Sequence, residues 1–244
     1  QSPNQRTREE LFQYDFTTAG DVAKLLPASF GIQIPINYSV GEVIISPEFD
    51  PFYQDIKLKD RIDASSSNDE KNKIREQAID YTKRKNISIV GIKKISNLDK
   101  KKFYNIENFD FSYSFNEIYH HDYEIASQKN KNIRLQGNYG YNFQSLGISP
   151  FSEIKFLKNK KYLEWLRNFN FNPLPSSFSF SANINRTLNS QQFRDVYMEV
   201  ETEKSLLDLP VLVQTNYLFD NTYNLQYNLT RSARVNFTSS TSRI

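Results

Sequence analysis

The sequence has no cysteine among its 244 residues, and only seven glycines, one methionine and one tryptophan. The lack of cysteine excludes disulfides, thiolate catalysis and cysteine-based zinc sites. Seven glycines leave little room for phosphate-cradling loops, and neither a dinucleotide fingerprint nor a Gly-x-Ser-x-Gly elbow occurs. We therefore expect neither an enzyme nor a bound cofactor or metal.

Long apolar runs are also absent, because no stretch approaches the roughly 20 apolar residues that a membrane-crossing helix needs. The chain opens on Gln1 without a signal peptide, and its only methionine is Met198. We therefore expect a portion of a longer protein that is not a helical membrane protein.

The sequence also lacks a large excess of charge of either sign. Lysine and arginine number 31 against 28 aspartates and glutamates, which gives a net charge of only +3. Because a nucleic-acid-binding surface needs a basic patch or stripe, this balance argues against a nucleic-acid partner.

Aromatic residues are abundant. Phenylalanine and tyrosine number 19 and 15, although only 38% of the chain is hydrophobic. Aromatic side chains mixed with small polar ones favour strands over helices.

Apolar and polar residues alternate with a period of two in five long runs, which is typical of strands whose two faces meet different surroundings. Shorter runs near residues 87–89, 151–156, 193–200 and 211–219 predict further strands. The long apolar rows run from Phe30 to Val40, Phe109 to Phe115, Ile133 to Phe143, Phe178 to Ile184 and Tyr223 to Phe237.

Several of these runs are longer than ordinary strands, since globular strands usually have about 5 to 6 residues and tilted membrane-crossing strands about 9 to 11. Their polar rows consist mainly of asparagine, glutamine and serine, which suits a wet barrel lumen. We predict an all-β fold of antiparallel transmembrane β-barrel strands with short α-helices in the loops. The residues predicted to face lipid are Phe111, Tyr113, Tyr139, Tyr141, Phe180 and Tyr227, and those predicted to face the lumen are Asn138, Asn142, Asn183 and Asn228.

Loop helices are predicted over residues 67–82, where Ser67 and Glu70 have capping-box spacing, and over residues 158–170. The second helix either caps the strand ends or anchors at a membrane interface through Tyr162 and Trp165. A third short helix is predicted from Asp21 to Leu26.

Four residues do not fit the simple pattern. The adjacent His120 and His121 are expected at a polar loop tip and not at a metal site, because neighbouring strand residues point to opposite faces. Pro35 lies inside a strand run, where it predicts a bulge or a strand beside an opening. Arg231 interrupts an apolar row, so we expect it near an interface or covered by protein.

Four strings of residues combine this alternation with ordered turn residues, and through them the sequence resembles the SprA/Sov family of outer-membrane translocons, which belong to the type 9 secretion system of Bacteroidota and to gliding motility. The strings are Pro47–Asp55, Phe103–Phe109 with the following His-His-Asp-Tyr-Glu at 120–124, Leu188–Asp195 and Tyr223–Ser232.

The resemblance implies that residues 1–244 form one segment of a very large outer-membrane barrel, of the class that reaches roughly 36 strands. It implies a gated aqueous path for folded, secreted cargo proteins. The implied partners are the remainder of the parent barrel, outer-membrane lipid, a PorV-type shuttle barrel and a plug protein.

Two other functions stay open from the residues alone. One is a ligand-binding outer-membrane receptor barrel, and the other is a soluble β-sandwich adhesin. The surroundings of the aromatic rows separate them, because a barrel turns these rows to lipid and a sandwich turns them to a second sheet.

Overall fold

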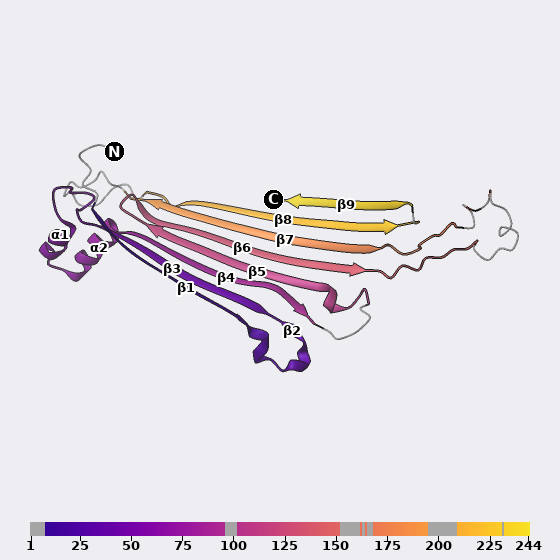
Figure 1. Cartoon of the computed structure of the whole chain (residues 1–244). Helices are drawn as coiled ribbons and strands as arrows, with labels where there is room; N and C mark the ends of the chain where they lie inside the picture. Colours follow the sequence, from indigo (N-terminus) through magenta and orange to yellow (C-terminus); the bar gives the residue numbers. More distant parts are fainter. Residues whose placement is uncertain are drawn as a thin grey trace.

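The computed structural model describes residues 8–95, 102–151, 162, 164, 168–194, 209–230 and 232–244, and these form one antiparallel sheet with two short α-helices at one end (Figure 1). The strands are β1 (Glu9–Asp21), β2 (Ile32–Gln33), β3 (Pro35–Pro47), β4 (Asp80–Lys94), β5 (Phe109–His121), β6 (Ile125–Asn142), β7 (Ser177–Phe193), β8 (Leu212–Asn228) and β9 (Arg234–Arg243). The helices are α1 (Leu58–Ala64), α2 (Asn68–Ala78) and the short 3-10 helices η1 (Val22–Leu25), η2 (Ala28–Phe30) and η3 (Ile106–Asn108).

The strands follow one another as an up-and-down meander in the order β1-β3-β4-β5-β6-β7-β8-β9, and β2 pairs with β4 beside β3. Every pairing is antiparallel, so the predicted all-β antiparallel class is confirmed. Within the described residues, β1 and β9 each have a neighbour on one side only, and the sheet is therefore open.

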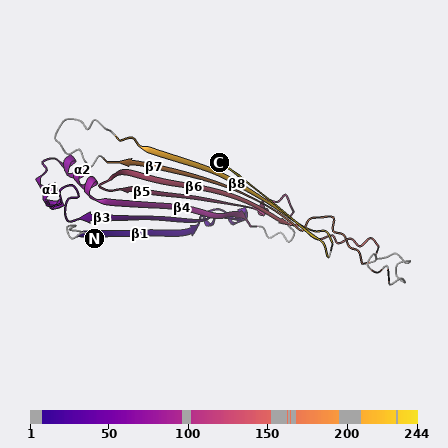
Figure 2. The ribbon, with the colours of Figure 1, turned by 90° about the horizontal axis from the view of Figure 1, so that it is seen from above.

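The sheet is a single layer. Figures 1 and 2 show the strands as one twisted layer, with α1 and α2 gathered at one end. The buried apolar side chains of the described residues are Leu58 and Ala78, and both belong to the helices. Ordinary domains bury a core between two layers, and the described part of this chain has no second layer over its sheet.

The loop between β3 and α1 is organised by Asp50, which is only 1% exposed. Its carboxylate accepts hydrogen bonds from the backbone N–H groups of Phe52 at 2.8 Å and Tyr53 at 3.2 Å, and from Arg61 Nη1 at 2.7 Å. The Arg61 guanidinium also lies 4.7 Å from the centre of the Tyr53 ring. A buried carboxylate is costly unless it is paired and hydrogen-bonded, and these contacts meet that requirement.

The helix predicted over 67–82 is present as α2, and Ser67 caps it by accepting from the Asp69 N–H at 3.3 Å. The predicted end is wrong, because Asp80 already begins β4 and Tyr81 pairs with Ile44. Strand pairing overrides the helical spacing here. Helix α1 was not predicted, since its seven residues are too few to show a helical period beyond the one pair Leu58 and Ile62.

The apolar row from Phe30 to Val40 is not one strand. Phe30 lies in η2, and Gly31 ends that turn in the left-handed region at φ 57°. Pro35 is the first residue of β3, where its missing N–H costs no internal ladder bond. Pro35 itself is not a bulged residue, although the register across β4 shifts by one residue between the Gln33–Lys93 and Ile36–Ile89 pairs. The alternative of a strand beside an opening stays a prediction. The short helix predicted from Asp21 to Leu26 is present as η1 with Asp21 as its cap.

The longest predicted run, Tyr223 to Phe237, is a hairpin between β8 and β9 and not one strand. The Thr230 N–H donates to the Ala233 carbonyl at 3.2 Å, and Thr230 Oγ1 accepts from the Ala233 N–H at 3.0 Å. Threonine side chains stabilise turns in this way. Arg231 lies outside the described residues.

The predicted helix 158–170 lies mostly outside the described residues, Trp165 among them. The flanking segments leave the sheet at the end opposite α1 and α2 (Figure 1). They pair through an isolated bridge between Ile148 and Phe171. Of the helices in the described residues, none has both the length and the apolar character needed to cross a bilayer.

Candidate functional site

The cross-strand register gathers the aromatic rows on one face of the sheet, which we call the apolar face. Tyr139 of β6 lies between Phe109 of β5 and Phe180 of β7 in the register. The Tyr139 ring is 4.8 Å from the Phe109 ring and 5.9 Å from that of Phe178. All six residues predicted to face lipid share this face: Phe111, Tyr113, Tyr139, Tyr141, Phe180 and Tyr227.

Small residues make room for the rings on this face. Phe111 pairs with Gly137, which in turn pairs with Ala182. A Cβ added to Gly137 would lie 3.3 Å from the Phe111 ring, so the ring lies over the glycine. Gly137 thus leaves the space that the Phe111 ring occupies on the apolar face.

A cluster of aromatic rings closes the apolar face at the end away from α1 and α2. The Tyr139 hydroxyl donates to the Phe103 carbonyl at 2.6 Å. The Phe103 ring is 6.5 Å from the Tyr141 ring, which is 4.7 Å from that of Phe143. Tyrosine rings such as these two are common where an apolar surface meets a polar one, because one end of the side chain is apolar and the other carries a hydroxyl.

The opposite face carries amides and hydroxyls, and we call it the polar face. Asn138 donates to Asp110 Oδ1 at 2.8 Å and accepts from Ser181 Oγ at 2.8 Å. The register places all four residues predicted to face the lumen here: Asn138, Asn142, Asn183 and Asn228. Which solvent meets either face stays a prediction.

A charged row crosses the apolar face between its aromatic part and the helices. Lys83 is paired with Glu42, and Lys131 Nζ is 3.4 Å from Glu117 Oε1. Register adds Lys85, which lies opposite Glu117. Lys129 and Arg186 complete the row. The sequence prediction missed this row because it ended each run at the last apolar residue, although the alternation continues into the charges.

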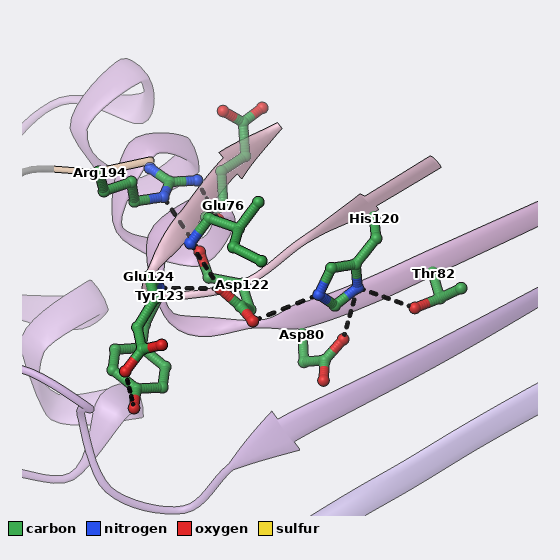
Figure 3. Close-up of polar contacts among 9 residues, drawn as sticks. Glu76, Asp80, Thr82, His120, Asp122, Tyr123, Glu124 and Arg194 are labelled. Carbon is green, nitrogen blue, oxygen red and sulfur yellow. Dashed lines mark hydrogen bonds and ion pairs between the residues drawn. The ribbon is translucent and has the colours of Figure 1, made fainter. Parts of the chain in front are cut away.

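Beyond this row, a polar cluster lies where β4, β5 and α2 meet (Figure 3). His120 Nδ1 is 3.0 Å from Thr82 Oγ1 and 3.3 Å from Asp80 Oδ1. Its Nε2 is 3.2 Å from Asp122 Oδ2. The loop-tip prediction for the two histidines is wrong, because both lie in the last positions of β5, where pairing with β4 continues to His121.

Arg194 ties this cluster to α2 (Figure 3). Its Nε donates to the Asp122 carbonyl at 3.0 Å and its Nη2 to the Glu76 carbonyl at 3.0 Å. Burial raises the pKa of Asp80. Burial and the nearby positive charge of Arg194 lower the pKa of His121, which favours its neutral form.

The cluster joins β4, β5 and α2. His120 lies on the polar face with Asp80 and Thr82, whereas His121 lies on the apolar face, 5.3 Å from the Tyr81 ring. In the described part of the chain, no three histidine, aspartate or glutamate side chains are placed to hold a metal ion. The geometry therefore favours a structural clamp between the sheet and its helical end.

A family model described as a motility related/secretion protein, SprA_N, matches residues 1–62. The chain carries a SprA-family segment. The resemblance inferred from the sequence is thereby confirmed, and the protein is related to motility and secretion. A search of the curated proteins gave no match.

The SprA match covers β1, β3, the Asp50 loop and most of α1. It includes the string Pro47–Asp55, whose aspartate organises the loop. The other three strings that carry the resemblance lie outside the match. Their described residues lie before β5 and at its end, at the end of β7, and in the β8–β9 hairpin.

Proposed function

We propose that this SprA-family segment is part of the wall of the protein-conducting outer-membrane translocon of the type 9 secretion system, which gives folded cargo proteins a gated aqueous path. The observation that carries the proposal is the single-layer sheet with one aromatic face and one face of amides and hydroxyls. A barrel wall needs no second layer, because lipid covers one face and water the other.

The extent of the apolar rows supports this proposal. On β6 the apolar row runs from Ile133 to Tyr141, which agrees with the roughly 9 to 11 residues of a tilted membrane-crossing strand. The charged row bounds it at one end and the aromatic cluster at the other. An apolar belt with aromatic girdles is typical of outer-membrane barrels.

The open edges indicate that other strands complete the wall. A membrane-spanning sheet must pair every backbone group, so β1 and β9 each require a further strand in lipid. We propose that the remainder of the parent barrel supplies these strands. On this view the PorV-type shuttle barrel and the plug protein contact the assembled barrel, which acts without catalysis.

The soluble β-sandwich alternative is less favoured. A sandwich would bury the aromatic face against a second sheet, yet Phe111 remains 49% exposed. In the described residues nothing lies over it.

Nitroxide scanning of β7 tests the proposal. Single cysteines from Phe178 to Asn185 would be spin-labelled in the parent protein in bilayers, because β7 is paired on both sides and the native chain segment has no competing thiol. We expect even positions to be relaxed by oxygen from lipid and odd positions by a water-soluble nickel reagent.

Two results would contradict this assignment. If the even positions are reached by neither reagent, protein covers the apolar face and the segment is not a lipid-facing wall. If both rows are reached from water, the sheet lies outside the membrane.

A further inference from the structure

We infer that the charged row of the apolar face binds the phosphate groups of anionic lipids. This inference rests on the proposed function, because it needs the aromatic part of the same face to lie against acyl chains. It goes beyond that function by assigning a ligand class to specific residues.

The row carries more positive than negative charge. Its acids are Glu42 and Glu117, which pair with Lys83 and Lys131. The remaining cations are Lys85, Lys129 and Arg186, which are all exposed and make no ion pair within the described residues. The unpaired charge on the row is therefore positive.

The three cations on β6 and β7 surround one residue, Leu188. Lys131 lies directly opposite Leu188 in the register, and Lys129 lies opposite Ser190, two residues farther along β7. Arg186 lies two residues in the other direction and on the same face. Neighbouring strands are about 4.8 Å apart, and residues two apart in one strand about 6.6 Å, so these long side chains can reach a common anion above Leu188.

The order of groups along the face matches the order within a lipid molecule. The apolar part of the face begins next to Arg186 with Leu135, Ala182 and Ile184, where the acyl chains of a lipid would lie. Lysine and arginine side chains at such a boundary extend their charged ends toward the headgroups while their stems stay on apolar surface. Arginine in particular binds phosphate with two parallel hydrogen bonds.

Charge complementarity decides between the occupants of this surface. A zwitterionic lipid would leave the excess positive charge unmatched, whereas an anionic phospholipid neutralises it. Each lysine or arginine near an anionic membrane surface changes the attraction about fivefold. Two of these cations should therefore produce a clear preference for anionic lipid at this place on the barrel.

Site-specific photocrosslinking in the full parent protein tests the inference. A benzophenone amino acid would replace Leu188, or Phe180 on the same strand and face but in the aromatic part, in vesicles of equal phosphatidylglycerol and phosphatidylcholine. We expect the ratio of phosphatidylglycerol to phosphatidylcholine adducts at Leu188 to exceed that at Phe180 by about fivefold or more.

A matched pair of double variants tests whether the row causes this preference. Lys129→Gln/Arg186→Gln should lower the ratio at Leu188 to that at Phe180. Arg84→Gln/Arg134→Gln, which removes two exposed arginines from the polar face, should leave it unchanged.

The outcomes separate failure of this inference from failure of the proposed function. If both positions form lipid adducts with the same ratio of phosphatidylglycerol to phosphatidylcholine, the phosphate site alone is overturned. The same holds if Phe180 forms lipid adducts and Leu188 forms only protein adducts. No lipid adduct at either position overturns the proposed function and the phosphate site with it.

Discussion

Replacing Asp50 should open the loop between β3 and α1 without unfolding the sheet. The Asp50→Ala change removes the acceptor of two backbone N–H groups and leaves Arg61 without its 2.7 Å partner. Breaking a buried ion pair by removing one member costs about 3 to 5 kcal/mol. The Arg61 side chain is 21% exposed and can be hydrated once Asp50 is gone. We therefore expect the free-energy cost of Asp50→Ala to lie at the lower end of this range, about 3 kcal/mol.

Hydrogen exchange of residues 48–62 in the parent protein, followed by mass spectrometry, measures this opening. A cost of about 3 kcal/mol corresponds to exchange about 150-fold faster. Asp50→Asn keeps an oxygen for both N–H groups and loses only the charge toward Arg61, so its effect should be about 2 kcal/mol.

Asp55→Asn is the control for these variants, because Asp55 lies in the same loop and is exposed. It should leave exchange unchanged. If Asp50→Ala exchanges like the wild type, or if Asp55→Asn has the same effect, Asp50 does not organise this loop.

Three further changes test the faces, the backbone and the clamp. Phe180→Lys should cost about 2 to 4 kcal/mol if it faces the middle of a bilayer, whereas Ser181→Lys should cost far less, as measured by urea titration of the barrel folded in vesicles. Gly91→Ala should lower the free energy of unfolding by about 1 to 2 kcal/mol through its φ of 76° alone, because nothing lies close to an added Cβ. Hydrogen exchange of residues 87–94 should rise in this variant, whereas Gly140→Ala should leave that exchange unchanged. The pKa of His121 is lowered in the folded chain, so its contribution to stability is present above the ordinary value of 6.5 and is lost as pH falls. The opening of the β5–β6 turn, measured as the exchange rate divided by the intrinsic rate of the unprotected amides at the same pH, should therefore increase below about pH 6.5, and His121→Gln should flatten that increase.

Strand alternation predicted most of the sheet because a period of two is unambiguous where one face is aromatic and the other consists of amides. It failed where the backbone changes direction without breaking the pattern, as at Gly31 and in the β8–β9 turn. Strand β1 was missed although Phe12, Tyr14 and Phe16 alternate, because this run is short and has only three apolar positions. The end of α2 was set by the pairing of β4, which local spacing does not encode.

The two faces were predictable, and the polar contacts at the helical end were not. Successive residues of a strand point to opposite faces, so the sequence sufficed to place Tyr139 and Asn138 on different faces of the sheet. The contacts of His120 with Asp80, and of Arg194 with Glu76, join residues far apart in the chain. Such contacts depend on strand register, which one sequence without structure does not reveal.

The turn from Leu229 to Ala233 constrains how this part of the chain can change in length. Leu225 pairs with Phe237 and Tyr227 with Val235, so the odd-numbered residues of both strands share one face. Inserting or deleting a single residue in the turn, with the β8 pairing kept, would shift every later residue of β9 to the opposite face. Changes of two residues would preserve the faces, so viable length variants of this turn should differ by even numbers.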